Sequence, residues 1–536
     1  GINAEYGAYQ MDLKEPSVHA SQRSRSQTNR SQANTQQTID SVASKVTVDP
    51  EGEIMKRTTF PLLLNYLVSE LINIFNVFVV WYYSSTEVVL QLAVCYPICY
   101  FISQAIPKAI SQAQFAYITK SIAESKIKQA DECMAYHFVI QGCYFVLSCF
   151  FAFFIAISFK KQCGLADTDT NYASTYIPLV CVAGTLLAIF NQSTEALLLL
   201  EGQNQFNCVR SMTTSILQLL FVMMAYQFSK ASGIQCSLTE LAVGQILGQF
   251  VPAVLMAVYY QDFKPMVGYQ GVLKAKFNYL KQFQVKQMVN MLLLALPKIS
   301  QFGSQMLIAF SCHMVVTQVF TEEIDIFIAR IGLLYYLLGF NLFGFVMQTY
   351  IYSSEAELSL NLLQKKYVRS KELLLKGLIW AVVLQALFLI LAFVMGTQIL
   401  LFFIPDTSAK DKNFFSLYGE PYLGYSYFLP ILMVPFQYCQ AVYAIEANWR
   451  MNILLNLIHP VIAVITIIVL QVAVGDRCEL FWVEFYADLF AGISGTVLLI
   501  RKIFEVMQLA KIELKRLKKK KKLEEEGKAQ ELEKFD

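Results

Sequence analysis

The sequence contains few charged residues for its length. Asp, Glu, Lys and Arg make up 15% of its 536 residues, whereas 56% are hydrophobic and 14% are aromatic. An ordinary soluble domain carries about 25% charged residues, so this composition indicates a membrane protein. The net charge of +3 gives no reason to expect nucleic acid as a partner.

Motifs that would identify an enzyme are missing as well. The sequence has no G-x-x-x-x-G-K-[ST] loop, so we do not expect it to hydrolyse ATP. It also lacks G-x-S-x-G, H-E-x-x-H and C-x-x-C, and its 4 histidines and 12 cysteines form no cluster with zinc spacing. We therefore expect neither an enzyme nor a bound cofactor or metal.

The cysteines follow no disulfide pattern. Most lie within apolar stretches, where Cys behaves as a small hydrophobic residue. Cys163, Cys236 and Cys478 fall in loops that we place outside the membrane. A Cys163–Cys236 disulfide and free thiols are both compatible with this arrangement.

The first 55 residues lack the apolar core of a secretory signal peptide. They are rich in Ser, Gln, Asn and Thr, and such a composition cannot bury enough apolar surface to fold. We expect a disordered cytoplasmic tail over 1–55.

Apolar stretches long enough to cross a bilayer follow this tail. We predict an all-α membrane protein with twelve transmembrane helices, at 59–83, 88–115, 133–159, 175–200, 206–228, 237–260, 288–312, 325–351, 374–402, 422–446, 451–474 and 480–503. A basic loop over 261–287 divides them into an N-lobe (56–260) and a C-lobe (288–503), with six helices each.

The two halves resemble each other, which predicts pseudo-symmetric lobes. The turns LEGQNQFN (200–207) and IEANWRMN (445–452) occupy corresponding places. Pro61 and Pro297 also correspond, and we expect a helix kink at each.

Basic residues, Arg210 among them, are more frequent in the loops and adjoining helix ends on the side of the N-terminus. The opposite loops carry only Lys160, Lys161, Lys230, Lys410, Lys412 and Arg477. We therefore expect both termini in the cytoplasm, at the plasma membrane or an internal membrane. The segment 504–536, which contains KRLKKKKK, is predicted to be a basic cytoplasmic tail that binds anionic lipid. The alternative is a solvated helical tail without a partner.

The first predicted span, Phe60–Tyr83, carries polar residues at helical spacing. Four of them share one face: Asn65, Ser69, Asn73 and Asn76. Glu70 lies beside this face. Such side chains are unfavourable against lipid, so we expect them to line a cavity. Glu70 is our best candidate for binding a coupling cation, and the alternative is a structural Glu paired to Lys108.

Polar residues in other spans are predicted to complete the cavity. The candidates are Gln104, Lys108 and Gln112 in the second span and Lys298, Gln301 and Gln305 in the seventh. The alternatives are a Lys that extends to the membrane interface and hydrogen bonding between helices.

Two carboxylates in the last span form a second candidate cation site. Glu484 and Asp488 lie one helical turn apart, so they share a face and are a candidate proton or cation site. The alternative is that both are hydrated near the outer surface. Glu195 is a weaker candidate, which we place near the cytoplasmic boundary. We expect His313 and His459 to be packing residues without partners.

Four stretches together resemble the multidrug and toxic compound extrusion (MATE) transporters of the polysaccharide-exporter and flippase superfamily. They are PLLLNYLVSELINIFNVFVVWYY, LLLLEGQNQFNCVRS, LALPKISQFGSQMLIAF and YFLPILMVPFQYCQAVYAIEANWRMN, within about 55–501. The resemblance implies a V-shaped cavity between two lobes and multidrug efflux, in which organic cations or amphiphiles leave as H⁺ or Na⁺ enters.

Two positions depart from that family. Many MATE transporters have a cation-binding Asp where this chain has Asn76, and often a Glu where it has Gln305. An amide keeps hydrogen bonding but does not titrate. We therefore expect a monomeric H⁺ or Na⁺ antiporter of small organic solutes in which Glu70 takes over the coupling. The alternatives are a flippase for lipids or lipid-linked saccharides, and a non-transporting membrane scaffold.

Overall fold

The computed structural model describes most of the chain between residues 60 and 525. The gaps are 124–126, 163–170, 201–203, 261–283, 320–357, 359–360, 397–428, 447 and 470–481. Across these described ranges, every regular element is a helix. The predicted tail over 1–55 and the eighth predicted span, 325–351, lie outside them.

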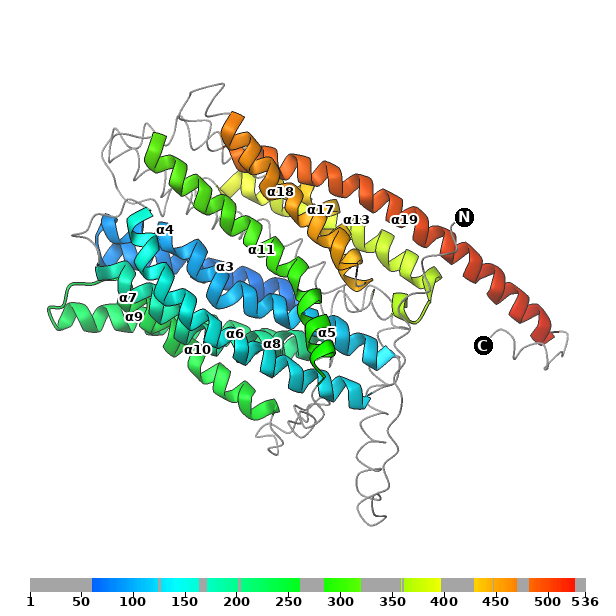
Figure 1. Ribbon diagram of the computed structural model, residues 1–536, viewed down its shortest axis with the longest axis horizontal. Helices are drawn as coiled ribbons and strands as arrows, with labels where there is room; N and C mark the ends of the chain where they lie inside the picture. Colours follow the sequence, from blue (N-terminus) through cyan, green and yellow to red (C-terminus); the bar gives the residue numbers. More distant parts are fainter. Residues whose placement is uncertain are drawn as a thin grey trace, which may run out of the picture.

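The N-lobe contains the helices from α3, shown in blue, to α10, shown in green, in Figure 1. They match the first six predicted spans: α3 (Phe60–Tyr83), α4 (Thr86–Tyr100) with η2 (Phe101–Ala105) and α5 (Ile106–Ala123), α6 (Ile127–Gln162), α7 (Asn171–Leu179) with η3 (Val180–Gly184) and α8 (Thr185–Leu200), α9 (Asn204–Ala231) and α10 (Leu238–Tyr260). The short η segments are π-helical insertions within otherwise continuous spans.

The described helices of the C-lobe match the remaining predicted spans except the eighth. They are α11 (Val285–Val319), α13 (Tyr367–Leu391) with η5 (Ala392–Gly396), α17 (Leu429–Ile445), α18 (Trp449–Val469) and α19 (Trp482–Glu525). α19 continues well past the predicted span end at 503, and Figure 1 shows it extending beyond the other helices. Helix-forming Leu, Lys, Glu and Arg fill this extension, which contains no Gly or Pro.

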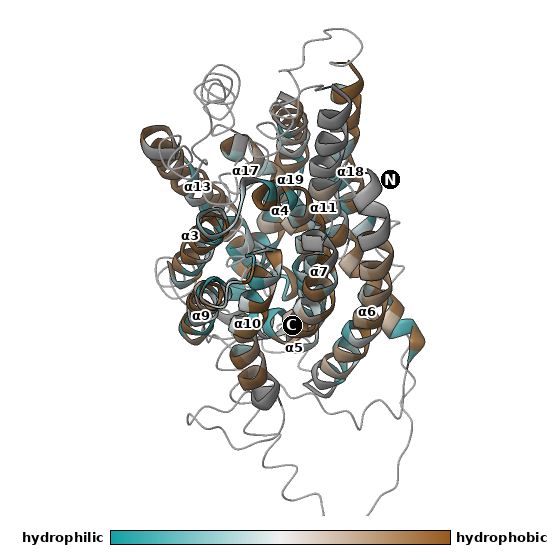
Figure 2. Ribbon diagram, turned by 90° about the vertical axis from the view of Figure 1, so that its left-hand side faces the viewer, coloured by the Kyte–Doolittle hydropathy of each residue, from teal (hydrophilic) through white to brown (hydrophobic). Residues whose placement is uncertain are grey.

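The helices have the length and surface of membrane spans. Eight described stretches are long and apolar enough to cross a bilayer, and Pro430–Ile445 is apolar but shorter. Large apolar side chains are exposed on the outside, as at Phe153 (67%) and Phe228 (71%). Figure 2 shows brown hydrophobic residues along most of the helices, with teal hydrophilic patches around α3, α9 and α10. The chain is an integral, multi-pass membrane protein.

The two prolines expected to kink helices lie at different places in the described helices. Pro61 is the second residue of α3, whose description begins at Phe60, so the kink expected at Pro61 stays a prediction. Pro297 lies inside α11, and its carbonyl oxygen accepts a hydrogen bond from Asn456 Nδ2 of α18 at 2.6 Å.

Glycines allow two pairs of helices to approach closely. A Cβ added to Gly244 or Gly248 of α10 would lie 2.4 Å from the backbone of α9. In the C-lobe, a Cβ on Gly495 of α19 would lie 2.3 Å from the Cα of Phe436 in α17. Backbone contact of this kind replaces the hydrophobic effect as the source of helix association in a membrane.

Among the described residues, the lobes touch near both ends of the helices. Met291 and Ala295 of α11 join the buried cluster formed by α5 and α6, and the Gln284 amide donates to Tyr136 Oη at 2.8 Å. Near the other end, Phe388 of α13 and Phe485 of α19 pack against the N-lobe core. α11 also packs along α18, so it lies between the lobes.

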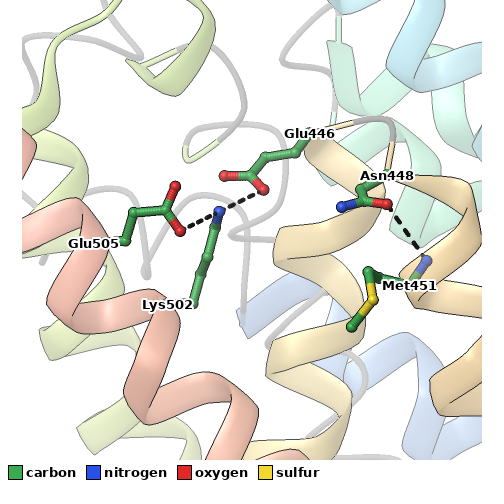
Figure 3. Close-up of polar contacts among 5 residues, drawn as sticks. All are labelled: Glu446, Asn448, Met451, Lys502 and Glu505. Atoms are coloured by element: carbon green, nitrogen blue, oxygen red, sulfur yellow. Dashed lines mark hydrogen bonds and ion pairs between the residues drawn. The ribbon is translucent and has the colours of Figure 1, made fainter. Parts of the chain in front are cut away.

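An ion cluster attaches α19 to the turn between α17 and α18. Lys502 Nζ lies 2.7 Å from Glu446 Oε2 and 2.9 Å from Glu505 Oε2, as Figure 3 shows. Further along α19, Glu513 Oε2 accepts the Val368 amide of α13 at 2.8 Å. The extension of α19 is therefore held against the rest of the C-lobe.

The possible Cys163–Cys236 disulfide stays a prediction. Cys236 is a free cysteine in the structure, and Cys163 lies outside the described residues.

Candidate functional site

A polar cavity of about 210 Å³ lies inside the N-lobe. α3, the α4–η2–α5 span, α8, α9 and α10 form its walls, and most of its lining residues are polar. They include Asn65, Tyr66, Ser69, Glu70, Asn73, Tyr96, Tyr100, Ser103, Gln104, Lys108, Tyr176, Asn191, Gln192, Glu195, Arg210, Ser211, Thr214, Ser215, Gln218, Gln245 and Gln249.

The polar face of α3 forms one wall. Ser69 Oγ and Ser215 Oγ of α9 are 2.9 Å apart, so this face is hydrogen-bonded across to the neighbouring helix. Glu70 Oε2 accepts a hydrogen bond from Asn73 Nδ2 at 3.2 Å, one turn further along α3. The carboxylate is thus held by a neutral amide rather than by a cation.

Tyr66 connects the two charged groups on the next wall. Lys108 Nζ donates to Tyr66 Oη at 2.8 Å and lies 5.0 Å from the centre of the Tyr66 ring. Tyr66 Oη in turn donates to Glu195 Oε1 at 3.5 Å, which is a long, weak bond. The expected pairing of Lys108 with Glu70 is therefore not formed.

Arg210 brings a second cation to the cavity from α9. Its two terminal nitrogens donate to Asn191 Oδ1 at 3.3 Å and to Asn207 Oδ1 at 3.0 Å. Asn191 belongs to α8, so the arginine joins α8 and α9 at the cavity wall. Arg210 is 9% exposed, which shows that its charge lies within the lobe.

The two π-helical segments shape the remaining wall. Ser103 of η2 and Gly184 of η3 meet there, since a Cβ on Gly184 would lie 3.6 Å from Ser103 Cβ. Carbonyl groups in and just after η2 accept hydrogen bonds from α6: Tyr144 Oη donates to Ile102 O of η2 at 2.6 Å, and Gln141 Nε2 donates to Pro107 O of α5 at 2.9 Å. Insertions of this kind are frequent at functional sites.

The structure brings five of the predicted site residues together around the cavity: Asn65, Glu70, Asn73, Gln104 and Lys108. Asn76 and Gln112 do not line it. Asn76 is buried at 3% exposure, with no hydrogen-bond partner among the described residues for its amide atoms. Lys298 is half-buried on α11. The side chains of Gln301, Gln305 and Glu484 are not among those that the structure describes.

Several cavity residues escaped the sequence analysis. Arg210 looked like a charge at a cytoplasmic helix end, and Glu195 like a boundary residue. The spacing of Asn207, Arg210 and Thr214 on one face of α9 was a usable signal. Tyr66, like the other cavity tyrosines, gave no signal, because aromatic residues are abundant throughout the chain.

Polar residues in the C-lobe bind one another directly. His459 Nε2 and Asp488 Oδ1 are 2.5 Å apart, and both residues are buried. The prediction that His459 lacks a partner is therefore wrong, and Asp488, at 2% exposure, is not a hydrated surface group. Nearby, Gln440 Nε2 donates to Asn456 Oδ1. Over the part of the chain that the structure describes, no group of three or more His, Cys, Asp or Glu could hold a metal ion.

Comparison with known proteins identifies the fold. No protein-family model and no curated protein matches the sequence. Solved structures do match. A MATE protein in complex with MaL6 has a TM-score of 0.70 at 12% identity, over 87% of this chain and 99% of that one.

Two further structures match in the same way. The MATE multidrug transporter DinF-BH has a TM-score of 0.69 at 14% identity, over 87% and 97% of the two chains. A MOP superfamily transporter from Pyrococcus furiosus, whose reverse polarity of the binding pocket suggests a different function, has a TM-score of 0.69 at 12% identity, over 86% and 98%. These similarities confirm the predicted fold of twelve helices in two lobes.

Proposed function

We propose that this chain, which has the fold of the MATE transporters, is a secondary transporter that exports small organic solutes by alternating access. The solute carries positive charge and binds in the N-lobe cavity, and H⁺ or Na⁺ moves in the opposite direction. One observation supports this most directly. Charged side chains surround a cavity inside a lobe whose outer surface is apolar.

Charged side chains inside a membrane protein cost free energy unless they are paired, and they commonly mark a functional site. Glu70 and Lys108 each hydrogen-bond to an uncharged partner, and neither forms an ion pair with any described residue. A positively charged solute would compensate for the desolvation of Glu70. A structural role alone would favour direct pairing of the two, as the C-lobe achieves with His459 and Asp488.

Glu70 supports the coupling in this proposal. Its carboxylate lines the cavity, so a coupling cation and a positively charged solute compete for the same group. Competition of this kind makes loading with one ligand release the other, which is the basis of exchange. Asn76 cannot exchange a proton and lies off the cavity, so we assign it no part in coupling.

The test is transport by the purified full-length protein in liposomes. We expect ethidium, a fluorescent organic cation, to accumulate against its gradient when a pH or Na⁺ gradient is imposed. Glu70→Gln should abolish the accumulation, because the amide binds neither H⁺ nor Na⁺ as a carboxylate does. Glu87→Gln, at an exposed position in the first turn of α4, is the matched control and should retain it.

Other outcomes of this assay would indicate a different function for the protein. Downhill ethidium movement that ignores both gradients indicates a facilitator. Movement of a fluorescent phospholipid between leaflets, without ethidium transport, indicates a flippase. If the protein moves neither probe under any gradient, the scaffold interpretation replaces the transporter.

A further inference from the structure

We propose that the basic end of α19, residues 511–522, is a docking surface for an acidic protein that holds a helix in an apolar groove. This partner binds outside the membrane, so the surface is independent of the solute that the proposed function assigns to the cavity. Three observations support it: the position of this helix end, its exposed leucines and the basic residues around them.

The packing of α13 on α19 locates the edge of the membrane. The Val368 amide of α13 donates to Glu513 of α19 at one end of the pair. Phe388 of α13 and Phe485 of α19 pack against the same core at the other end, so the two helices are antiparallel. The apolar run of α13 begins after Lys376, which marks the boundary of the hydrocarbon layer.

The basic end of α19 stands clear of this boundary. On α19 the boundary lies near Glu505, since 505 precedes 513 by as many residues as 376 follows 368. From Glu505 the helix rises about 20 Å to Lys518 and about 24 Å to Lys521. The headgroup layer on one side of a bilayer is only about 5–8 Å thick. The backbone at both lysines is therefore farther from the headgroups than the electrostatic screening length of about 8 Å, and a protein in the aqueous phase can reach them.

Two exposed leucines continue the face by which α19 packs on the C-lobe. Val506 and Ala510 are buried on this face, and Leu514 and Leu517 follow at helical spacing. These leucines are 45% and 51% exposed. A nucleic acid would gain little from such an apolar stripe, whereas an apolar groove in a protein would bury it.

Basic residues flank the two leucines. Lys511 and Lys518 lie at i−3 and i+4 from Leu514, and Lys521 lies at i+4 from Leu517, so these side chains are neighbours on the helix surface. All three lysines are exposed, and none forms an ion pair with a described residue. Carboxylates on the rim of a groove would pair with them. A second copy of the same segment is disfavoured, because like charges would meet.

The test is the binding of two acidic proteins to the purified full-length chain in phosphatidylcholine nanodiscs. Calmodulin loaded with Ca²⁺ opens an apolar groove that accepts helices, whereas parvalbumin barely opens. At physiological ionic strength we expect calmodulin to bind at least about tenfold more tightly than parvalbumin. Equal binding of the two proteins, or no binding of calmodulin, would overturn the proposal.

The apolar stripe can be removed without disturbing the fold. Leu514→Ala combined with Leu517→Ala should weaken calmodulin binding about tenfold or more. Ile512→Ala is the matched control, because Ile512 is 50% exposed on the opposite face of the helix, and it should change the affinity less than about twofold. Alanine retains helix propensity, so every variant should unfold like the native chain. An equal loss in the control would show that the assigned face is wrong.

Reversal of one charge tests the electrostatic contribution. Lys518→Glu should weaken calmodulin binding about three- to tenfold, and added salt should reduce the difference. Lys286→Glu changes an exposed lysine in the first turn of α11 in the same way and should leave the affinity unchanged. Equal losses in the two variants would indicate attraction by the overall charge and overturn the assignment to α19.

Protection from trypsin separates the protein partner from anionic lipid, which the sequence also predicts for this segment. Calmodulin should slow cleavage after Lys515 and Lys518, and phosphatidylserine in the nanodiscs should not. Protection by phosphatidylserine without calmodulin binding would overturn the proposal in favour of the membrane. Neither measurement depends on transport. Loss of calmodulin binding therefore leaves the proposed transporter intact, and absence of transport leaves the docking surface intact.

Discussion

Replacing Gly248 with alanine tests whether close packing of α9 and α10 maintains the cavity. The added Cβ would lie 2.4 Å from both the Cα and the N of Gln218, whereas ordinary contacts begin at 3.4 Å. Because the obstacle is backbone, no side-chain rotation relieves it, and α9 must retreat by about 1 Å. Gln218 and its neighbour Ser215 both line the cavity, so the retreat changes the site as well.

The expected loss of stability follows from two opposing contributions. Overpacking a well-packed core costs about 1–3 kcal/mol, and a backbone clash belongs at the upper end. Alanine recovers up to about 1 kcal/mol relative to glycine in a helix. We therefore expect Gly248→Ala to lower the free energy of unfolding by about 1–2 kcal/mol.

Gly142 provides the control, because a Cβ there meets no atom within 4 Å. Gly142→Ala should leave the protein as stable as the native chain or more stable by about 1 kcal/mol. Both variants can be measured by circular dichroism during unfolding in mixed dodecyl maltoside and SDS micelles, and by ethidium transport in liposomes. Equal stability of the two variants, or unchanged transport by Gly248→Ala, would refute the packing argument.

Three further predictions concern the C-lobe, each measured by the same unfolding assay. Lys502→Met removes the cation between two partly exposed carboxylates and should lower the free energy of unfolding by about 1–2 kcal/mol, less than for a fully buried pair. His459→Phe leaves Asp488 buried without its donor and should cost about 3 kcal/mol, most of which Asp488→Leu in the same chain should restore. Glu513→Gln weakens the acceptor of the Val368 amide and should cost about 1 kcal/mol or less. Additive losses in the His459 and Asp488 double variant, or no loss for Lys502→Met, would contradict these contacts.

Local periodicity predicted the part of the site that one helix carries. Asn65, Glu70 and Asn73 lie within nine residues of α3, so helical geometry alone places them along one wall. Lys108 was expected beside Glu70, and it does line the same cavity. Its choice of Tyr66 over Glu70 depends on distances between separate helices, which the sequence does not contain.

Contacts between distant helices were the main failure of the sequence analysis. His459 and Asp488 are 29 residues apart on α18 and α19, and spacing rules within a helix cannot pair them. Arg210 was assigned to a helix end because a basic residue near a polar turn usually lies at the membrane surface. The structure instead buries it between α8 and α9, where asparagines accept its hydrogen bonds.

The end of the last predicted span is not the end of its helix. Hydropathy marked where α19 stops being apolar, near 503, but the backbone hydrogen bonds continue as far as Glu525. Lys-rich sequence without Gly or Pro retains high helix propensity, so the end of an apolar stretch is not the end of its helix.

The extension of α19 makes it a lever. From 504 to 525 a straight helix is roughly 33 Å long. The lysines near its end therefore lie farther from its base than the electrostatic screening length of about 8 Å. Because Glu513 and Lys502 fix this rod to α13 and to the α17–α18 turn, the rod must follow any tilt of the C-lobe. A tilt of roughly 10° would move the tip by about 6 Å. A fluorophore placed there would therefore report movements of the lobe that are small at its centre.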